Sequence, residues 1–173
     1  KKVMKSRRNI VFLGMMGSGK TSIGLLVSKK LNIDFLVIDL CIEKKLNSKI
    51  PKIFKEKGEK FFREFEEKIT LEILKKNHSL ISLGGGAFLN KKIRSEVLAN
   101  HLSFWLKWSP ELITKRIINS SKRPIVMNMN KNELINLTNE RSKVYSKAKY
   151  SINCDNLSKN KVVKKIIDIY EAN

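Results

Sequence analysis

Eight residues close to the beginning of the chain have the types and the spacing of a phosphate-binding loop. Residues Gly14 to Thr21 read GMMGSGKT, which fits the pattern GxxxxGK[ST]. Glycines let the backbone curl until successive N–H groups converge on phosphate oxygens. In such a loop Lys20 reaches the β- and γ-phosphates, and the Thr21 hydroxyl is placed to ligate Mg²⁺. We therefore expect the chain to bind a nucleoside triphosphate, in preference to the alternative of a glycine-rich turn that binds nothing.

The elements around this loop fit the same interpretation. An apolar run precedes it and is typical of a buried strand, and an amphipathic stretch follows it as a helix whose dipole would favour an anion. Strand and helix patterns alternate to the end of the chain, which favours an α/β fold with a parallel sheet and helices on both faces. We expect strands at 9–13, 35–38, 80–83, 102–106 and 150–153, and helices at 20–31, 40–46, 50–57, 60–76, 91–98, 110–118, 131–147 and 159–170.

The bulk composition limits the classes of protein to consider. At 173 residues we expect one domain spanning 1–173, and no window approaches the ~20 consecutive apolar residues of a membrane span. The net charge of +20 comes mostly from lysines dispersed along the sequence, which we interpret as a solvated surface and not a nucleic-acid site. The two cysteines, Cys41 and Cys154, fit neither a disulfide framework nor a metal site. We expect a cytoplasmic monomer without a nucleic-acid or membrane partner.

Two charged residues in the first half of the chain could act on a substrate. Asp39 ends the second expected strand, at the edge where parallel sheets bind ligands, and could accept a proton from a hydroxyl that attacks phosphorus. Its structural alternative is an N-cap for the helix at 40–46. Arg63 lies within one helical turn of Glu59 and Glu66, which could hold it for a ligand carboxylate. The same spacing is also typical of an ordinary surface ion pair.

Three further features follow along the chain. The triplet Gly84–Gly86 comes directly after a strand, where exposed N–H groups and close backbone approach favour contact with a ligand. Arg123 precedes Pro124 in a polar stretch, 119–130, that we expect to form a mobile lid and to stabilise charge in the transition state. Arg141, on the following helix, is a second candidate for anion binding. For each arginine the alternative is a solvated side chain.

Together these segments resemble the shikimate kinase family over nearly the whole chain. Each segment alone is a weak signal, but all six occur in the family order and at the family spacing. They are GxMGxGK[ST]xxG at Gly14–Gly24, DxxIE at Asp39–Glu43, GExxFRxxE at Gly58–Glu66, GGG at Gly84–Gly86, RP at Arg123–Pro124 and RxxxY at Arg141–Tyr145. The resemblance implies a nucleoside monophosphate kinase-like P-loop fold. It also implies transfer of the γ-phosphoryl group of ATP to the 3-hydroxyl of shikimate, on the route to chorismate and the aromatic amino acids.

The resemblance also implies a role for each matching residue. Arg63 and Arg141 would grip the substrate carboxylate, Asp39 would bind ring hydroxyls and act as base, and the Gly85 and Gly86 amides would approach the ring. The substrate helices would span about 40–76. Lys20 and Arg123 would flank the transferred phosphoryl group, Arg116 would stack on adenine, and the 153–160 loop would cover the other face of the base. The expected contacts of ATP and Mg²⁺ are Gly17, Ser18, Gly19, Lys20, Thr21, Ser22, Arg116 and Arg123, with Thr21 on the metal.

One position departs from the family pattern. The family usually reads DxDxxIE, and Val37 stands where the first aspartate would hold waters on Mg²⁺. Asp34 cannot replace it, because three residues of strand place it about 10 Å away on the opposite face. We therefore expect weaker Mg²⁺ binding or lower turnover. Three alternatives remain: a related kinase of another hydroxylated substrate, an ATP-responsive protein that binds nucleic acid, and an inactive relative.

Overall fold

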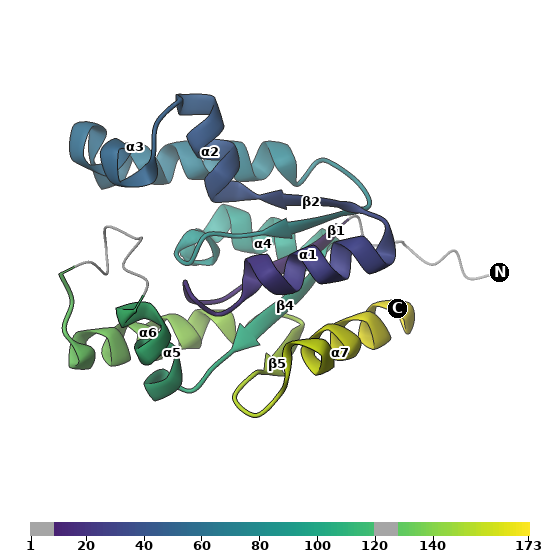
Figure 1. Ribbon diagram of the computed structural model, residues 1–173. Coiled ribbons are helices and arrows are strands. Elements are labelled where there is room, and N and C mark those ends of the chain that lie inside the picture. Colours follow the sequence, from purple (N-terminus) through teal and green to yellow (C-terminus); the bar gives the residue numbers. More distant parts are fainter. Residues whose placement is uncertain (1–8, 120–127) are drawn as a thin grey trace.

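Five parallel strands form the middle layer of a three-layer α/β fold (Figure 1). The computed structural model describes residues 9–119 and 128–173. The order across the sheet is β2-β3-β1-β4-β5, and every neighbouring pair is parallel. The predicted five-stranded parallel sheet is therefore confirmed. The strands are β1 (Asn9–Leu13), β2 (Asp34–Val37), β3 (Ser79–Ser82), β4 (Leu102–Lys107) and β5 (Tyr150–Asn153).

Helices cover both faces of the sheet. On β1, Ile10 and Phe12 belong to the core beneath α1 and α7. Val11 and Leu13 belong to the core on the opposite face, to which α2 to α6 contribute. This alternation follows from the period of two in a strand, and it explains why β1 is apolar at both kinds of position. The helices are α1 (Lys20–Leu31), α2 (Ile38–Leu46), α3 (Ile50–Ile73), α4 (Lys91–Asn100), α5 (Pro110–Ile118), α6 (Lys131–Tyr145) and α7 (Lys159–Glu171), with a short 3₁₀ turn, η1 (Ala87–Leu89).

The central place of β1 determines what lies around the phosphate-binding loop. β1 pairs with β3 on one side and with β4 on the other. Because parallel strands end at the same edge, the segments that follow β3 and β4 flank the loop that follows β1. These flanking segments are the glycine triplet Gly84–Gly86 and the residues from Trp108 onward. Ligands of open parallel sheets bind at such a position, where connections diverge from a central strand.

The structure differs from the predicted secondary structure at two places near the site. Asp39 neither ends a strand nor caps a helix: it lies in the first turn of α2, and Val37 is the N-cap. The ladder with β3 stops at Val37, and helical spacing then buries Ile38 and Ile42 together. The expected helices at 50–57 and 60–76 form one run, α3, with a kink at Gly58, whose φ of 82° and ψ of 167° are not helical. The 3₁₀ turn η1 was not predicted.

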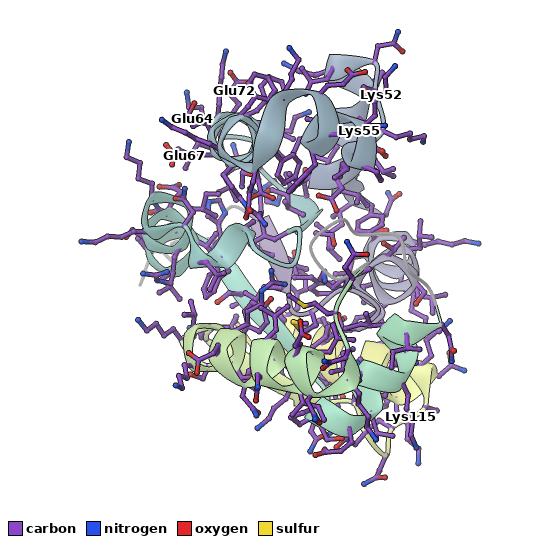
Figure 2. All side chains as sticks on the ribbon, turned by 90° about the vertical axis from the view of Figure 1, so that its left-hand side faces the viewer. Lys52, Lys55, Glu64, Glu67, Glu72 and Lys115 are labelled. Atoms are coloured by element: carbon purple, nitrogen blue, oxygen red, sulfur yellow. The ribbon has the colours of Figure 1, made fainter. Side chains whose placement is uncertain are left out.

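Charged side chains project outward from the helices. In Figure 2 the labelled lysines of α3, Lys52 and Lys55, lie on one side of the helix and its labelled glutamates, Glu64, Glu67 and Glu72, on the other, with Lys115 of α5 at the opposite end of the molecule. Salt bridges on this surface join exposed partners, as in the pair Lys52–Glu56 at 3.8 Å. Such pairs contribute little to stability. None of the helices in the described ranges combines the length and apolar character needed to cross a bilayer.

Candidate active site

A cavity of about 810 Å³ opens at the carboxyl edge of the sheet. One wall is the phosphate-binding loop with the first turn of α1, from Gly17 to Ser22. The opposite wall comes from the end of β2 and from α2, including Val37 and Asp39. The segment Ser82–Gly85 forms the floor between them. The cavity therefore brings the candidate base and the phosphate-binding loop to one site.

The loop has the backbone that its glycines predict. Gly14, Gly17 and Gly19 have φ values of 143°, 74° and 94°, in the region that glycine tolerates and other residues avoid. The Lys20 ammonium donates to the carbonyl oxygens of Gly14 at 2.7 Å and Met15 at 2.8 Å, so it lies inside the curl of the loop. The first turn of α1 contains no acidic residue. The helix dipole and the lysine therefore act together on an anion without a competing carboxylate there.

Two arginines lie against Gly85, which lines the cavity, and against the next residue, Gly86; the arginines themselves are not among the residues that line it. A Cβ at Gly86 would come within 2.7 Å of both terminal nitrogens of Arg63, and a Cβ at Gly85 would come within 3.2 Å of Nη1 of Arg141. Guanidinium groups thus occupy the space that side chains at Gly85 and Gly86 would take. Arg63 comes from α3 and Arg141 from α6, so only the fold brings them together.

Arg63 is fixed by carboxylates of its own helix. Its Nη1 donates to Oε1 of Glu66 at 2.8 Å, and its Nε lies 3.7 Å from Oε1 of Glu59. The Glu66 side chain is only 2% exposed, so this is not the surface ion pair that the spacing alone favoured. A buried carboxylate strengthens the hydrogen bond and restricts the guanidinium plane.

Arg141 is a buried cation. The residue is 8% exposed, and within the described ranges no carboxylate lies at ion-pair distance and its Nε has no hydrogen-bond partner. Its Nη1 lies 3.8 Å from the Met15 sulfur. One turn later Tyr145 donates its hydroxyl to the Gly85 carbonyl, which ties α6 to the glycine triplet. A buried guanidinium is costly without an anion, so this position fits a ligand carboxylate.

The cavity can accept Mg²⁺ with few protein ligands. The Thr21 hydroxyl and the Asp39 carboxylate line it, whereas Val37 adds an apolar side chain. No cluster of three His, Cys, Asp or Glu residues occurs in the described part of the chain. Mg²⁺ bound with nucleotide phosphates keeps several waters and needs only one or two protein ligands, so these residues fit the ion. Asp34 pairs with Ser79 at the other end of β2, which agrees with its exclusion from the site.

A smaller cavity of about 200 Å³ adjoins the loop on the side of β4. It shares Gly19, Ser22 and Arg116 with the larger cavity. The Nε of Arg116 donates to the Gly17 carbonyl at 2.5 Å, and its guanidinium lies 4.5 Å from the ring centre of Trp108. Trp108 also packs against the core and was not among the predicted site residues. Its position directly after a strand next to β1 is the signal that could have placed it at the site.

Cys154 also lines the smaller cavity. Burial raises the pKa of its thiol to about 11, and the neighbouring Asp155 carboxylate acts in the same direction. Burial likewise raises the pKa of the half-buried Cys41. Cys154 is buried and Cys41 is partly buried, and both thiols are free. Two candidate residues, Arg123 and Pro124, lie outside the described residues.

Comparison with known proteins agrees with this geometry. The family model for shikimate kinase matches residues 16–171. The shikimate kinase of Bacillus subtilis is 43% identical over 163 residues, covering 93% of this chain and 88% of that protein. The shikimate kinase of Caldicellulosiruptor saccharolyticus is 40% identical over 95% of this chain and 96% of that protein. A solved structure of the Acinetobacter baumannii shikimate kinase in complex with shikimate has a TM-score of 0.90 at 28% identity, covering 99% of this chain and 97% of that one. The chain belongs to the shikimate kinase family.

Proposed function

We propose that this chain is a shikimate kinase, which transfers the γ-phosphoryl group of ATP to the 3-hydroxyl of shikimate and forms shikimate 3-phosphate and ADP. The observation that carries the proposal is the pair of guanidinium groups behind Gly85 and Gly86, next to the phosphate-binding loop. Two cations against adjacent glycines, one of which lines the cavity, suit a substrate with a carboxylate, because a planar guanidinium binds a carboxylate through two parallel hydrogen bonds. Family membership supports the identity of the substrate.

The proposed contacts of shikimate come from two groups of residues. Arg63 and Arg141 bind the carboxylate, and the backbone at Gly85 and Gly86 approaches the ring. Asp39 faces the cavity from α2 and binds ring hydroxyls. As base, its carboxylate accepts the proton of the 3-hydroxyl while that oxygen attacks phosphorus. Holding the hydroxyl in line with the γ-phosphate contributes much of the rate acceleration in such reactions.

Charge on the transferred group is stabilised from the nucleotide side. The backbone N–H groups of Gly17, Ser18 and Gly19 and the Lys20 ammonium donate to the phosphates, together with Thr21 and Ser22. Mg²⁺, held by the Thr21 hydroxyl, supplies neutralisation of the phosphate charge when it is bound. We keep Arg123, on a lid at 119–130, as the second cation at the phosphoryl group, and Arg116 as the platform for adenine.

The remaining assignments concern the state of the protein. We propose that residues 1–173 act as one domain, that the protein is a cytoplasmic monomer, and that it binds neither nucleic acid nor membranes. One continuous sheet supports a single domain, and the glutamates that α3 carries among its lysines speak against a surface for nucleic acid. A steep fall of RNA or DNA binding with salt, in the absence of phosphoryl transfer, would favour the alternative of a nucleic-acid-binding protein.

A coupled assay with ATP, Mg²⁺ and shikimate tests the proposed reaction. We expect ADP and shikimate 3-phosphate to form in equal amounts. Arg63→Ala and Arg141→Ala should each raise the KM for shikimate by at least about tenfold, because each removes hydrogen bonds to a charged group, and should leave the KM for ATP unchanged. Gluconate or a nucleoside monophosphate outperforming shikimate would assign the chain to another kinase reaction. Absence of product above background would overturn the enzymatic assignment.

A further inference from the structure

Trp108 lines the smaller cavity between the segment after β5 and the phosphate-binding loop. Its chain neighbours are both anchored to the segment after β5: the Lys107 carbonyl accepts from the Cys154 N–H at 2.8 Å, and the Ser109 N–H donates to Asp155 Oδ1 at 2.8 Å. The backbone on either side of the tryptophan is therefore held in place. From this position the half-buried indole reaches across to the phosphate-binding loop.

The indole makes two contacts of different kinds. Its Nε1–H donates to the Ser18 carbonyl at 2.8 Å, within the loop. The Arg116 guanidinium lies 4.5 Å from the centre of the indole ring, a distance at which a cation is attracted to an aromatic face. Arg116 in turn donates to the Gly17 carbonyl. Trp108, Arg116 and the loop peptides thus form a closed set of contacts that join α5 to the loop.

Arg116 needs such support because it is an exposed residue on the last turns of α5. A free arginine samples many rotamers, and ordering it on ligand binding costs conformational entropy. Packing one face of the guanidinium on the indole removes much of that cost before a ligand arrives. The cavity that both side chains line continues into the phosphate site through Gly19 and Ser22.

We propose that Trp108 is a positioning residue for the nucleotide. The indole holds Arg116 flat against the base of a nucleoside triphosphate and fixes the Ser18 carbonyl, and through it the loop around the phosphates. This inference rests on the proposed stacking of Arg116 on the base. It concerns a side chain that acts through another residue, so its signature is a change in nucleotide binding that depends on Arg116.

A double-mutant cycle tests the proposal on the full-length chain. We expect Trp108→Leu to raise the KM for ATP about tenfold, since it removes both the hydrogen bond and the aromatic face. Trp108→Phe keeps a ring beneath the guanidinium and should raise it only about threefold. The KM for shikimate and the kcat should change less than about twofold in both. Trp108→Leu combined with Arg116→Ala should bind ATP only about threefold more weakly than Arg116→Ala alone, which is the loss expected from the hydrogen bond to Ser18.

Phe104→Leu is the matched control, because it removes an aromatic ring from β4, the strand that precedes Trp108, and Phe104 packs away from the loop against Phe12 and Tyr150. It should lower the melting temperature without changing the KM for ATP. If Trp108→Leu behaves like this control while Arg116→Ala weakens ATP binding, the positioning role is wrong and the assignment of Arg116 stands. If Arg116→Ala leaves ATP binding unchanged, both are wrong. Additive effects of Trp108→Leu and Arg116→Ala on ATP binding would also overturn the proposal. If the leucine variant does not fold, the cycle is measured with Trp108→Phe in its place.

Discussion

The Nη1 of Arg63 donates to Oε1 of Glu66 at 2.8 Å, and that carboxylate is almost fully buried one turn further along α3. Glu59, on the other side, is 60% exposed and lies 3.7 Å from Nε of the same arginine. The two acids look equivalent in the sequence, yet only Glu66 is placed to restrict the guanidinium. The distinction matters because Arg63 lies against Gly86, the residue that follows the cavity-lining Gly85.

Removing Glu66 should therefore weaken shikimate binding through Arg63. We expect Glu66→Ala to raise the KM for shikimate about tenfold and Glu66→Gln, which retains a weaker acceptor, about threefold. Glu59→Ala serves as the matched control and should stay within about twofold, as exposed pairs contribute little. Steady-state kinetics with each substrate varied in turn measure both effects. Equal losses from Glu59→Ala and Glu66→Ala would contradict the distinction.

Substitution of Gly86 should affect substrate binding more than the stability of the fold. Gly86 has a φ of −97°, so alanine introduces no backbone strain, but its Cβ would displace the Arg63 guanidinium. We expect Gly86→Ala to raise the KM for shikimate about tenfold, the scale of an overpacking cost of 1–3 kcal/mol.

Gly24→Ala provides the contrast, because its Cβ would meet the Phe35 ring at 2.4 Å, between α1 and β2. This variant should lower the free energy of unfolding by about 1–2 kcal/mol, partly offset by better helix propensity, with unchanged KM values. Denaturant unfolding and kinetics measured on both variants separate the two outcomes. A change in KM from Gly24→Ala as large as that from Gly86→Ala would show that the substrate effect is a general consequence of crowding.

Val37→Asp should strengthen Mg²⁺ binding in the presence of ATP. Val37 lines the cavity beside Asp39, so a carboxylate there would face the phosphate site. Outer-shell contacts of this kind typically change metal affinity by 10–100-fold, and we expect the half-saturating Mg²⁺ concentration to fall about tenfold.

Titrations of activity with Mg²⁺ at fixed ATP measure this shift. Val37→Asn controls for polarity without charge, and Asp34→Asn should have no effect because Asp34 lies at the far end of β2. An unchanged Mg²⁺ dependence of activity in Val37→Asp would mean that other groups determine the affinity for Mg²⁺.

Cys154 should make stability depend on pH in the alkaline range. Its pKa rises from an ordinary 9.0 to about 11 in the folded protein, mainly through burial. The folded state therefore holds this proton more tightly than the unfolded state, and the associated stability is present below about pH 9 and is lost as the pH rises toward about 11. Denaturant unfolding at pH 8, 9 and 10 should show a steeper decline for the natural protein than for Cys154→Ala.

The same burial predicts the order of thiol modification. A thiol reacts as the thiolate, so native Cys154 should react slowly at pH 8, and the half-buried Cys41 should react first. Mass spectrometry after brief alkylation identifies the modified residue. Rapid labelling of Cys154 in the native protein, or parallel pH profiles for the natural protein and Cys154→Ala, would contradict the raised pKa.

The sequence alone determined the features that depend on local spacing. The phosphate-binding loop is readable because its glycines, lysine and threonine act within eight consecutive residues, from Gly14 to Thr21. The parallel sheet is readable because short apolar runs alternate with helical patterns, which permits few other arrangements. Strand β5 appeared at its predicted bounds for this reason, and β1 did as well.

Only the tertiary structure decided which distant side chains meet. Arg63 and Arg141 reach neighbouring glycines from different helices, and no local pattern encodes that contact. Trp108 was not predicted at the site, because an aromatic residue after a strand gives the same pattern in the sequence whether it packs in the core or supports a ligand. Asp39 was predicted at the end of a strand but lies in a helix, because the pairing of β2 with β3 stops at Val37. In each case long-range packing, which sequence spacing does not specify, determined the position of the side chain.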